Sequence, residues 1–448
     1  MSEPYELSVA EAARLIGRKR LSSEELVASL LVRIARLEPK VRAWQVVDES
    51  GIRDAAARAT RALEAELRGV PFGIKDIIDV AGLPTSAGFK PLMDQPVEAD
   101  ATVVTRLREA GALILGKTVT TQFAHADPPV TRNPWNLERT PGGSSSGSAA
   151  AVAARMVPAA LGSQTGGSVL RPASYCGLVG LKPTFGRISR AGVVPLAWSL
   201  DHVGIMARTV ADVGIVLQVT AGFDKLDPGS ANRQARDFLR AVERAIVDKP
   251  KAPRLGYFPD LLEQAEPAVR DHVAEVANRL RGAGAQIHHL PFPDSYANVL
   301  AAHRLIMQPE MTAVHRQNLA QHPEHYARRI RASVEVGQLL PAAAYVHALR
   351  LRRRYQDAFR LLLRGLDGFL MPTVTNVAPD PRTTGDPSFQ SIWSLTGFPS
   401  ITLPTGLSPE GLPIGTQLIA HPFQESALIE AGRWVETEIG FVGPPPIG

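Results

Sequence analysis

The sequence predicts an α/β fold, in which a β-sheet is covered by helices, and three observations support this prediction. Short apolar runs typical of strands alternate with amphipathic helical stretches along the 448 residues. Glycine (37 residues) and proline (36 residues) are plentiful, which favours many tight turns over a helical bundle. No repeat of fixed period is present, which argues against a solenoid or propeller.

The elements of the first 156 residues follow from periodicity and from turn chemistry. Apolar residues at helical spacing predict the first helices, and Ser22 followed by Glu25 suits an N-cap. A β-branched apolar stretch around Lys75 predicts a strand that enters a loop. The predicted helices span 7–38 (split near 18–21), 51–68, 102–110 and 149–156, and the predicted strands span 70–80 and 112–115.

The residue pattern changes twice in the remaining chain. Residues 157–210 alternate short apolar runs with glycine and proline, as strands with close backbone contacts do. Residues 225–365 are rich in Arg, Ala and Leu, and we expect a variable helical region packed on the core. Strand and turn texture returns over 366–420. We therefore expect one domain over residues 1–448.

Bulk composition narrows the class of protein. Apolar residues make up 45% and charged residues 21%, which is typical of a globular protein. The net charge of +5 is spread along the chain without a basic stripe, so we expect no nucleic-acid partner. One cysteine, Cys176, allows neither an intramolecular disulfide nor a cysteine metal cage.

The N-terminal residues and the hydropathy pattern predict a cytoplasmic protein. The first residues carry acids early and lack a basic start followed by an apolar stretch, so they do not resemble a signal peptide. No run approaches the roughly 20 apolar residues that a membrane span needs. We therefore expect no membrane association.

A phosphate-loop pattern occurs at Gly111–Thr118, which reads Gly-Ala-Leu-Ile-Leu-Gly-Lys-Thr. In a true phosphate loop the four middle residues form a loop whose N–H groups face phosphate. Here they are Ala-Leu-Ile-Leu, which favour a buried strand. We therefore expect no nucleotide site at this position.

Two glycine- and serine-rich loops are stronger candidates for a functional site. Pro141–Ser148 is short and runs directly into an Ala-rich helix, unlike a flexible linker. In the second loop, Gly166 and Gly167 allow consecutive N–H groups to face one point and form an anion-binding nest. Ser168 at the edge of that nest is well placed to attack a carbonyl, with the oxyanion among the N–H groups of residues 165–168.

A nucleophilic serine needs a base, and the sequence offers histidine or lysine. No histidine lies in a Ser-His-Asp pattern, and there is no G-x-S-x-G elbow. Lys75 lies in an apolar stretch, where burial would lower its pKa from about 10.4 enough to leave it neutral. The alternative is a lysine that pairs with Asp76 or Asp79.

These segments together resemble the amidase signature family. The resemblance is dense over roughly 70–215 and 390–420, and residues 225–365 carry little of it. The matching segments are Gly73–Asp76, Pro141–Ser145, Thr165–Ala173, Tyr175–Thr184, Ser199–Gly204 and Gly411–Ile419.

The resemblance implies a Ser-Ser-Lys triad on a mixed, twisted sheet with helices on both faces. Ser168 would be the nucleophile, Ser144 the relay and Lys75 the base, with a cis peptide bond between Gly143 and Ser144. Thr165, Gly166 and Gly167 would form the oxyanion hole. The reaction is hydrolysis of a carbon–nitrogen amide bond in a small molecule through an acyl-enzyme, and it requires no cofactor and no metal.

Two departures refine the resemblance. Many members have Asp where this chain has Gln164, and Gly where it has Ser146; both changes also occur in small-substrate, malonamidase-like members. They weigh against the alternative, an ammonia-supplying component that resembles the A subunit of glutamyl-tRNA amidotransferase. Arg171 could bind a substrate carboxylate or serve a structural role, and Ser145 could contact substrate or support the hydrogen-bond network.

The remaining histidines point away from metal chemistry. His288-His289 and His322-x-x-His325 lie in the variable region without carboxylates at metal-ligand spacing. Asp201-His202 could be mistaken for part of a triad, but we expect Asp201 to cap a turn. The oligomeric state is open, and a homodimer is the default because it is the commonest oligomer.

Overall fold

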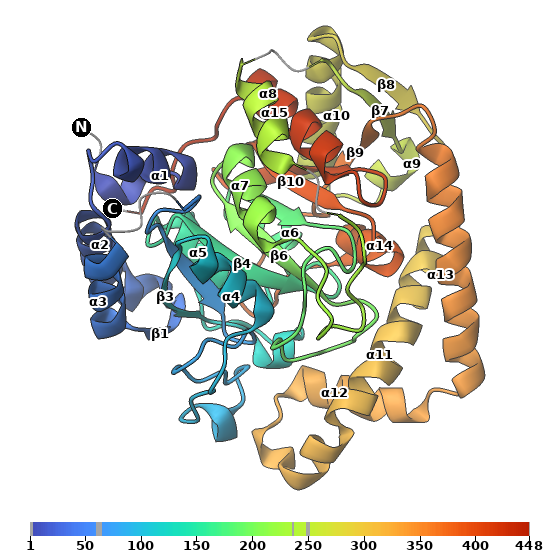
Figure 1. Ribbon diagram of the computed structural model, residues 1–448. Coiled ribbons are helices and arrows are strands. Elements are labelled where there is room, and N and C mark those ends of the chain that lie inside the picture. The colour runs from blue at the N-terminus through green and yellow to red at the C-terminus, as the bar shows by residue number, and fades with distance from the viewer. Residues whose placement is uncertain (1–2, 60–64, 235–236, 248–250, 448) are drawn as a thin grey trace.

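In the described part of the chain, eleven strands form one mixed β-sheet through the centre of the molecule (Figure 1). The computed structural model describes residues 3–59, 65–234, 237–247 and 251–447. The strands lie in the order β1-β3-β2-β4-β6-β5-β10-β11-β9-β7-β8. They are β1 (Trp44–Val47), β2 (Pro71–Lys75), β3 (Leu113–Thr118), β4 (Ala159–Gln164), β5 (Val179–Lys182), β6 (His202–Ala207), β7 (Arg254–Tyr257), β8 (Gln286–His289), β9 (Gly368–Pro372), β10 (Ser400–Leu407) and β11 (Pro413–Ile419).

Strand direction divides the sheet. β2 runs parallel to β3 and β4, and β7 runs parallel to β8 and β9. The other neighbouring pairs are antiparallel. Because parallel strands end at the same edge, the C-terminal ends of β2 and β4 lie side by side. That edge carries the candidate site.

Helices cover both faces of the sheet, as the sequence predicts. The described residues form α1 (Val9–Gly17), α2 (Ser23–Val41), α3 (Glu49–Ala59), α4 (Thr102–Glu109), α5 (Ser146–Ala153), α6 (Leu170–Tyr175), α7 (Val210–Thr220), α8 (Phe238–Val247), α9 (Pro259–Leu262), α10 (Pro267–Gly282), α11 (Tyr296–Gln321), α12 (Arg328–Leu339), α13 (Ala342–Leu362), α14 (Ser388–Thr396) and α15 (Glu425–Ile439).

Side-chain alternation along β4 shows how the two faces are filled. Leu161 points into the apolar cluster formed with α4 and α7, whereas its neighbour Ala160 joins the cluster formed with α3 and α5. Successive residues of a strand face opposite sides, so both sides of β4 are dry. The α/β prediction with a mixed, helix-covered sheet is confirmed.

Capping residues define the N-terminal helices. The Ser8 and Ser22 side chains each accept a hydrogen bond from the main-chain N–H three residues on. The carboxylates of Glu11 and Glu25 in turn accept a hydrogen bond from the main-chain N–H of Ser8 and Ser22. Such capping boxes satisfy N–H groups that a helix start leaves free. The split helix predicted over 7–38 is therefore confirmed.

Several predicted boundaries differ from the structure. The helix predicted over 51–68 is α3 and ends at Ala59; residues 60–64 lie outside the described part, and 65–68 form bends and turns. The Ala-rich helix α5 begins at Ser146, three residues before the predicted start. The short helix α6 was not predicted within 157–210, because its six residues are all buried and show no polar face.

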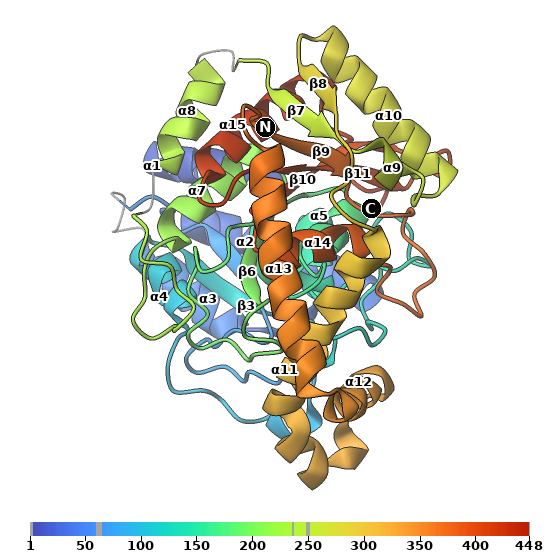
Figure 2. The ribbon, with the colours of Figure 1, turned by 90° about the vertical axis from the view of Figure 1, so that its right-hand side faces the viewer.

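The prediction of a helical stretch over 225–365 is incomplete. The helices α8 to α13 lie there, but so do β7 and β8, which extend the sheet beyond β9. Each strand has four residues, and β8 is a largely exposed edge strand, so neither gives an apolar run. Figure 2 shows α11 and α13 standing side by side on one flank of the molecule, with α12 at their lower end.

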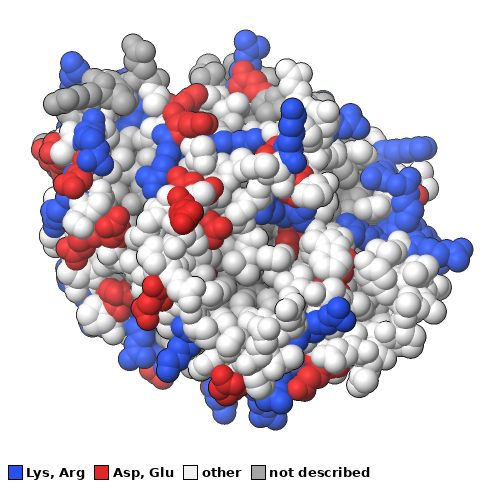
Figure 3. All heavy atoms as spheres, turned by 60° about the horizontal axis from the view of Figure 1, so that its bottom comes forward, with Lys and Arg blue, Asp and Glu red and all other residues white. Residues whose placement is uncertain are grey.

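The molecular surface carries charges of both signs. In Figure 3, Lys and Arg are interspersed with Asp and Glu over most of the face drawn, with more positive side chains along the right-hand edge. Among the described residues, no helix combines the length and apolar character that crossing a membrane requires.

A buried ion pair joins the first two strands of the parallel unit. Lys117 on β3 places its Nζ atom 3.1 Å from Asp76 Oδ1, and the two side chains are 0% and 2% exposed. Lys117 also donates to Pro84 O and Thr85 Oγ1, and Ser86 donates to Asp76. Each charge therefore has partners that offset its removal from water.

We expect Lys117→Met to destabilise the fold by about 3–5 kcal/mol, because it leaves the Asp76 carboxylate buried without its counter-charge. Urea denaturation measures the change. The matched control is Arg353→Met, which breaks the exposed i,i+4 pair with Asp357 and should change stability by no more than about 0.5 kcal/mol. Equal effects of the two substitutions would contradict this assignment.

Candidate active site

β2 carries Lys75 into the interior at its C-terminal end. The residue is fully buried between the neighbouring strands, with Thr118 of β3 opposite it. Its Nζ atom lies 2.7 Å from Ser144 Oγ and 2.8 Å from Ser163 Oγ. Burial lowers the pKa of Lys75 well below its ordinary value, and the distant Asp201 carboxylate offsets only part of this effect. A buried, neutral amine can accept a proton.

The alternative interpretation of Lys75 as the partner of a nearby carboxylate does not fit the structure. Asp76 pairs with Lys117 instead. Lys117 belongs to Gly111–Thr118, and the four middle residues of that pattern lead into the buried strand β3, as expected. The prediction that this segment is not a phosphate loop agrees with its strand geometry.

Ser144 sits in a loop held by packing rather than in a flexible linker. The peptide bond between Gly143 and Ser144 is cis, and Ser144 is fully buried. Its carbonyl oxygen accepts a hydrogen bond from Thr121 N, at 3.1 Å. Gly142 adopts φ +82°, and a Cβ atom there would lie 2.9 Å from Pro172 Cα, so a glycine is required.

Two further serines complete the surroundings of the amine. Ser163, near the end of β4, was not predicted; its contact with Lys75 follows from the parallel pairing of β2 and β4, which the sequence does not reveal. Ser145 is fully buried, and its hydroxyl bonds to the main-chain N and O of Ser163, both at 3.2 Å. Ser145 therefore lies within this network and not among the residues that line the cavity.

The turn at Thr165–Ser168 follows β4 directly. The carbonyl oxygens of residues 165, 166 and 167 accept hydrogen bonds, in that order, from His303 Nε2 (2.9 Å), Ser394 Oγ (2.7 Å) and the main-chain N of Arg171 (3.0 Å). In a trans peptide the C=O and the following N–H point in opposite directions. The N–H groups of residues 166–168 are therefore turned away from these partners. No described residue accepts a hydrogen bond from them.

Gln164 holds this turn against the start of α6. Its side-chain oxygen accepts hydrogen bonds from Val169 N (2.9 Å) and Leu170 N (3.0 Å), and its Nε2 donates to Ser394 Oγ, at 3.1 Å. A carboxylate at this position could accept from the two N–H groups but could not donate to Ser394. The glutamine at residue 164 thus adds a link between the turn and α14.

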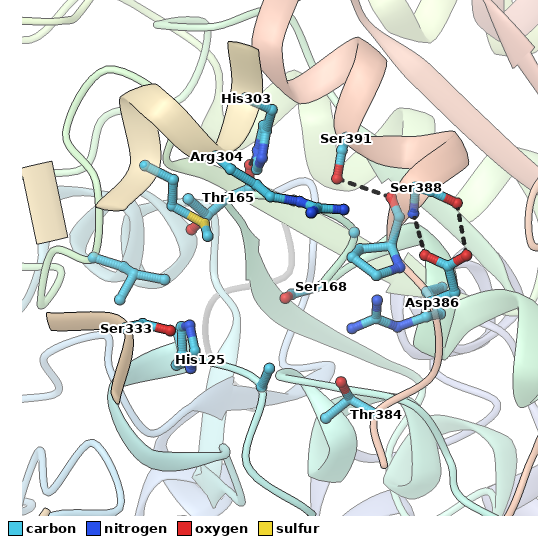
Figure 4. Close-up of a pocket in the computed structure, with 18 of the residues that line it drawn as sticks. His125, Thr165, Ser168, His303, Arg304, Ser333, Thr384, Asp386, Ser388 and Ser391 are labelled. Carbon is cyan, nitrogen blue, oxygen red and sulfur yellow. Dashed lines mark hydrogen bonds between the residues drawn. The ribbon is translucent and has the colours of Figure 1, made fainter. Parts of the chain in front are cut away.

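Ser168 opens into a cavity of about 300 Å³. Its residue is 8% exposed, and its hydroxyl has no hydrogen-bond partner among the described residues. Figure 4 shows Ser168 at the centre of the cavity, with α11 and the segment 384–391 forming opposite walls. The structure hydrogen-bonds Lys75 to Ser144, but it places no hydrogen bond between Ser144 and Ser168.

The sequence pattern of one family, described as Amidase, matches residues 25–429. The chain belongs to the Amidase family. This confirms the resemblance drawn from the Lys75, Ser144 and Ser168 segments.

Named relatives of this Amidase-family chain fall into two groups. The A subunit of the glutamyl-tRNA(Gln) amidotransferase of Roseiflexus castenholzii is 39% identical, with 96% of each chain covered. An amidase of Pseudomonas putida is 36% identical, again with 96% of each covered. The crystal structure of the peptide amidase from Stenotrophomonas maltophilia superposes with a TM-score of 0.87 at 30% identity and covers 100% of both chains. The malonamidase-like resemblance stays a prediction.

Arg171, on α6, faces both the loop Pro141–Ser148 and the cavity. Its Nη2 donates to Gly143 O at 2.6 Å, which supports the structural interpretation. Its Nε and Nη1 atoms are buried and have no partner among the described residues, and the residue lines the cavity. Burial lowers its pKa to about 10, so the guanidinium remains charged at neutral pH. The arginine therefore has N–H groups free for a ligand.

The two histidines near the turn are neutral, and His303 forms a hydrogen bond with the turn. His125 and His303 line the cavity, and burial lowers the pKa of each to about 4. Because a carbonyl only accepts, His303 Nε2 must carry the proton in its bond to Thr165 O. No signal in the sequence identifies His303, since its position depends on α11 packing against the turn.

Asp201 caps a turn, as predicted. Its Oδ2 atom accepts from Leu196 N (2.8 Å) and Ala197 N (2.9 Å), and its Oδ1 accepts from Thr165 Oγ1 at 2.5 Å. The adjacent His202 bonds through Nδ1 to the carbonyl oxygen of Leu200 at 2.6 Å. Neither side chain approaches Ser168 as part of a Ser-His-Asp arrangement in the described contacts.

The histidine pairs of residues 225–365 lie away from the cavity. His288 and His289 belong to the edge strand β8. His322 precedes the short 3-10 turn Pro323–His325, and His325 is its last residue. Across the described residues, no group of three or more His, Cys, Asp or Glu side chains is arranged to hold a metal ion.

The neutral state of Lys75 has a thermodynamic signature in the variant Lys75→Met. Between its lowered folded-state pKa and the ordinary value of about 10.4, the unfolded chain binds a proton at Lys75 that the folded chain does not. Stability therefore rises with pH in this window. We expect the wild type to gain up to about 1.4 kcal/mol per pH unit relative to Lys75→Met between pH 7 and 9.5.

Urea denaturation of both proteins at several pH values measures this slope. The hydrogen bonds lost with the side chain shift the difference by a constant, so only its pH dependence is diagnostic. A difference that does not change with pH would mean that Lys75 is protonated in the folded protein.

Proposed function

We propose that this chain hydrolyses a carbon–nitrogen amide bond of a small molecule through an acyl-enzyme on Ser168, with Ser144 as relay and Lys75 as base. The observation that carries the proposal is the fully buried Lys75 amine, 2.7 Å from Ser144 Oγ. Few other functions need an uncharged lysine beside one serine, Ser144, and a second serine, Ser168, that opens into a cavity.

The first half-reaction forms an ester at Ser168. Its hydroxyl turns toward Ser144 and attacks the amide carbon while its proton passes to Ser144 Oγ, and the Ser144 proton passes to Lys75 Nζ. The negative charge then develops on the carbonyl oxygen. The free N–H groups of residues 166–168 receive it, and removing one such donor typically slows a reaction by about 10²–10³-fold.

The proton path then reverses and completes the first half-reaction. The lysine ammonium returns its proton through Ser144 to the amide nitrogen, the carbon–nitrogen bond breaks, and ammonia or an amine leaves. In the second half-reaction, water attacks the Ser168 ester and gives its proton to the same relay, which returns it to Ser168 Oγ as the carbon–oxygen bond breaks. The carboxylic acid product leaves, and all three side chains regain their starting protonation.

The neighbouring residues have supporting roles in this proposal. Gly166, Gly167 and Ser168 supply the N–H groups of the oxyanion hole, and Thr165 positions the first of them through its carbonyl bond to His303. Ser145 holds the end of β4 through its two bonds to Ser163, and Arg171 offers its free N–H groups to substrate.

Other sequence-based expectations remain proposals. We take residues 1–448 as one amidase domain, because one sheet runs through the described part and includes β7 and β8 of residues 225–365. The cytoplasmic location and the homodimer stay predictions.

The test is ammonia release from a panel of primary amides, half-amides, ureides and anilides, combined with fluorophosphonate labelling. We expect Ser168→Ala to lose labelling and to lower kcat by more than about 10³-fold. Ser22→Ala, which changes only a helix cap, should keep both. Labelling of the Ser168→Ala variant at full stoichiometry would contradict the assignment of the nucleophile.

Lysine as base also fixes the pH profile. Activity should fall as pH drops below the folded-state pKa of Lys75, because the protonated amine cannot accept a proton. It should persist well below the ordinary lysine pKa, because burial lowers the pKa of Lys75. Lys75→Ala should lose activity at every pH, with no recovery in alkaline buffer. Recovery at high pH would assign the base elsewhere.

A second candidate is the component that supplies ammonia in a glutamyl-tRNA amidotransferase. It is favoured by the names of relatives such as the Roseiflexus castenholzii protein. That function needs partner chains, so affinity purification from the native cell should recover them in equal amounts. The protein purified alone and active on amides would exclude this candidate, as the residues Gln164 and Ser146 predict.

A further inference from the structure

The cavity beside Ser168 has an unequal distribution of charge. Three ionic side chains line it, Arg171, Arg304 and Asp386. The two histidines of the lining are neutral, because burial lowers the pKa of both to about 4. Two cations therefore face one anion around the candidate nucleophile.

Asp386 is held by neighbouring hydroxyl and N–H groups and forms no ion pair with a described residue. Its carboxylate accepts hydrogen bonds from Ser388 N (2.9 Å), Ser388 Oγ (2.8 Å) and Thr375 Oγ1 (3.5 Å). Its attraction for Arg171 partly offsets the effect of burial on the pKa of that arginine. Arg171 is anchored by its hydrogen bond to Gly143 O, whereas Arg304 has neither a hydrogen bond nor an ion pair with a described residue.

Arg304 is exposed and makes no hydrogen bond or ion pair with any described residue. Figure 4 shows its side chain extending from α11 across the cavity, above Ser168 and toward the wall that carries Ser391. The preceding residue, His303, is bonded to Thr165 O at 2.9 Å. The backbone of Arg304 is therefore fixed relative to the catalytic turn, although its guanidinium is free.

We propose that Arg304 selects amides that carry a carboxylate, namely the monoamides of short dicarboxylic acids. Arginine binds a carboxylate through two parallel N–H bonds. The cavity of about 300 Å³ suits a small ligand. This inference rests on the proposed function and adds its substrate class.

Matched substrate pairs test the charge preference. Succinamate and succinamide, like glutaramate and glutaramide, differ only in carboxylate against carboxamide. We expect the wild type to favour each half-amide in kcat/KM by about 10-fold or more, as a charge-assisted bond would give. Arg304→Gln should remove this preference, chiefly through KM, while kcat/KM for the diamides stays within about threefold.

Two variants control for charge and fold. Arg316→Gln removes a positive charge from the same helix at an exposed residue that does not line the cavity, and it should keep the preference. Arg304→Lys keeps the charge without the two-pronged geometry and should retain an intermediate preference. Rising salt should weaken half-amide turnover in the wild type, because the pair is accessible to solvent.

A binding measurement separates this inference from the catalytic proposal. Glutarate or succinate should raise the Tm of Ser168→Ala, and the shift should disappear in Ser168→Ala/Arg304→Gln. Turnover of diamides with no preference for half-amides, or equal losses on both in Arg304→Gln, would overturn the role of Arg304 and leave the amidase function standing. No turnover of any amide and no Ser168 labelling would instead defeat the proposed function.

Discussion

Dehydration of one amine organises this structure. Lys75 is the last residue of a strand that lies between two parallel neighbours, and the loop Pro141–Ser148 covers its side chain. Water therefore has no access to Nζ. A charged ammonium would be strongly disfavoured there, and a neutral amine is satisfied by the hydroxyls of Ser144 and Ser163. A carboxylate next to the amine would restore its charge. Asp76, although adjacent in sequence, is turned to Lys117, which keeps the two lysines in different electrostatic environments.

The turn at Thr165–Ser168 is oriented by the hydrogen-bond donors that bind its carbonyl groups. Each carbonyl of residues 165–167 is engaged on one side, by α11, by α14 or by the start of α6. Peptide planarity then turns the N–H groups to the other side. The glycines permit this backbone path, but the hydrogen bonds at its rear fix it. The orientation of the turn thus depends on the adjacent start of α6 and on α11 and α14, which are distant in sequence.

The sequence predicts the parts of the fold and site that are encoded locally. Capping boxes and apolar spacing predict the first helices, and the motifs around Lys75, Ser144 and Ser168 identify the family. It does not predict the parts that depend on long-range pairing. Ser163 meets Lys75 only because β2 and β4 run parallel, and His303 and Arg304 reach the cavity only because α11 packs beside the turn. The strands β7 and β8 escape notice because four residues are too few to show a period.

One hydrogen bond joins a wall of the cavity to the turn that precedes Ser168. His303 ties α11 to Thr165, while the same helix forms a wall of the cavity. A shift of α11 that changes the shape of the wall also moves the peptide group formed by Thr165 C=O and Gly166 N–H. Replacing residues 296–321 with those of a relative would therefore change the wall of the cavity and the orientation of the turn together, so the two cannot be varied independently through this helix.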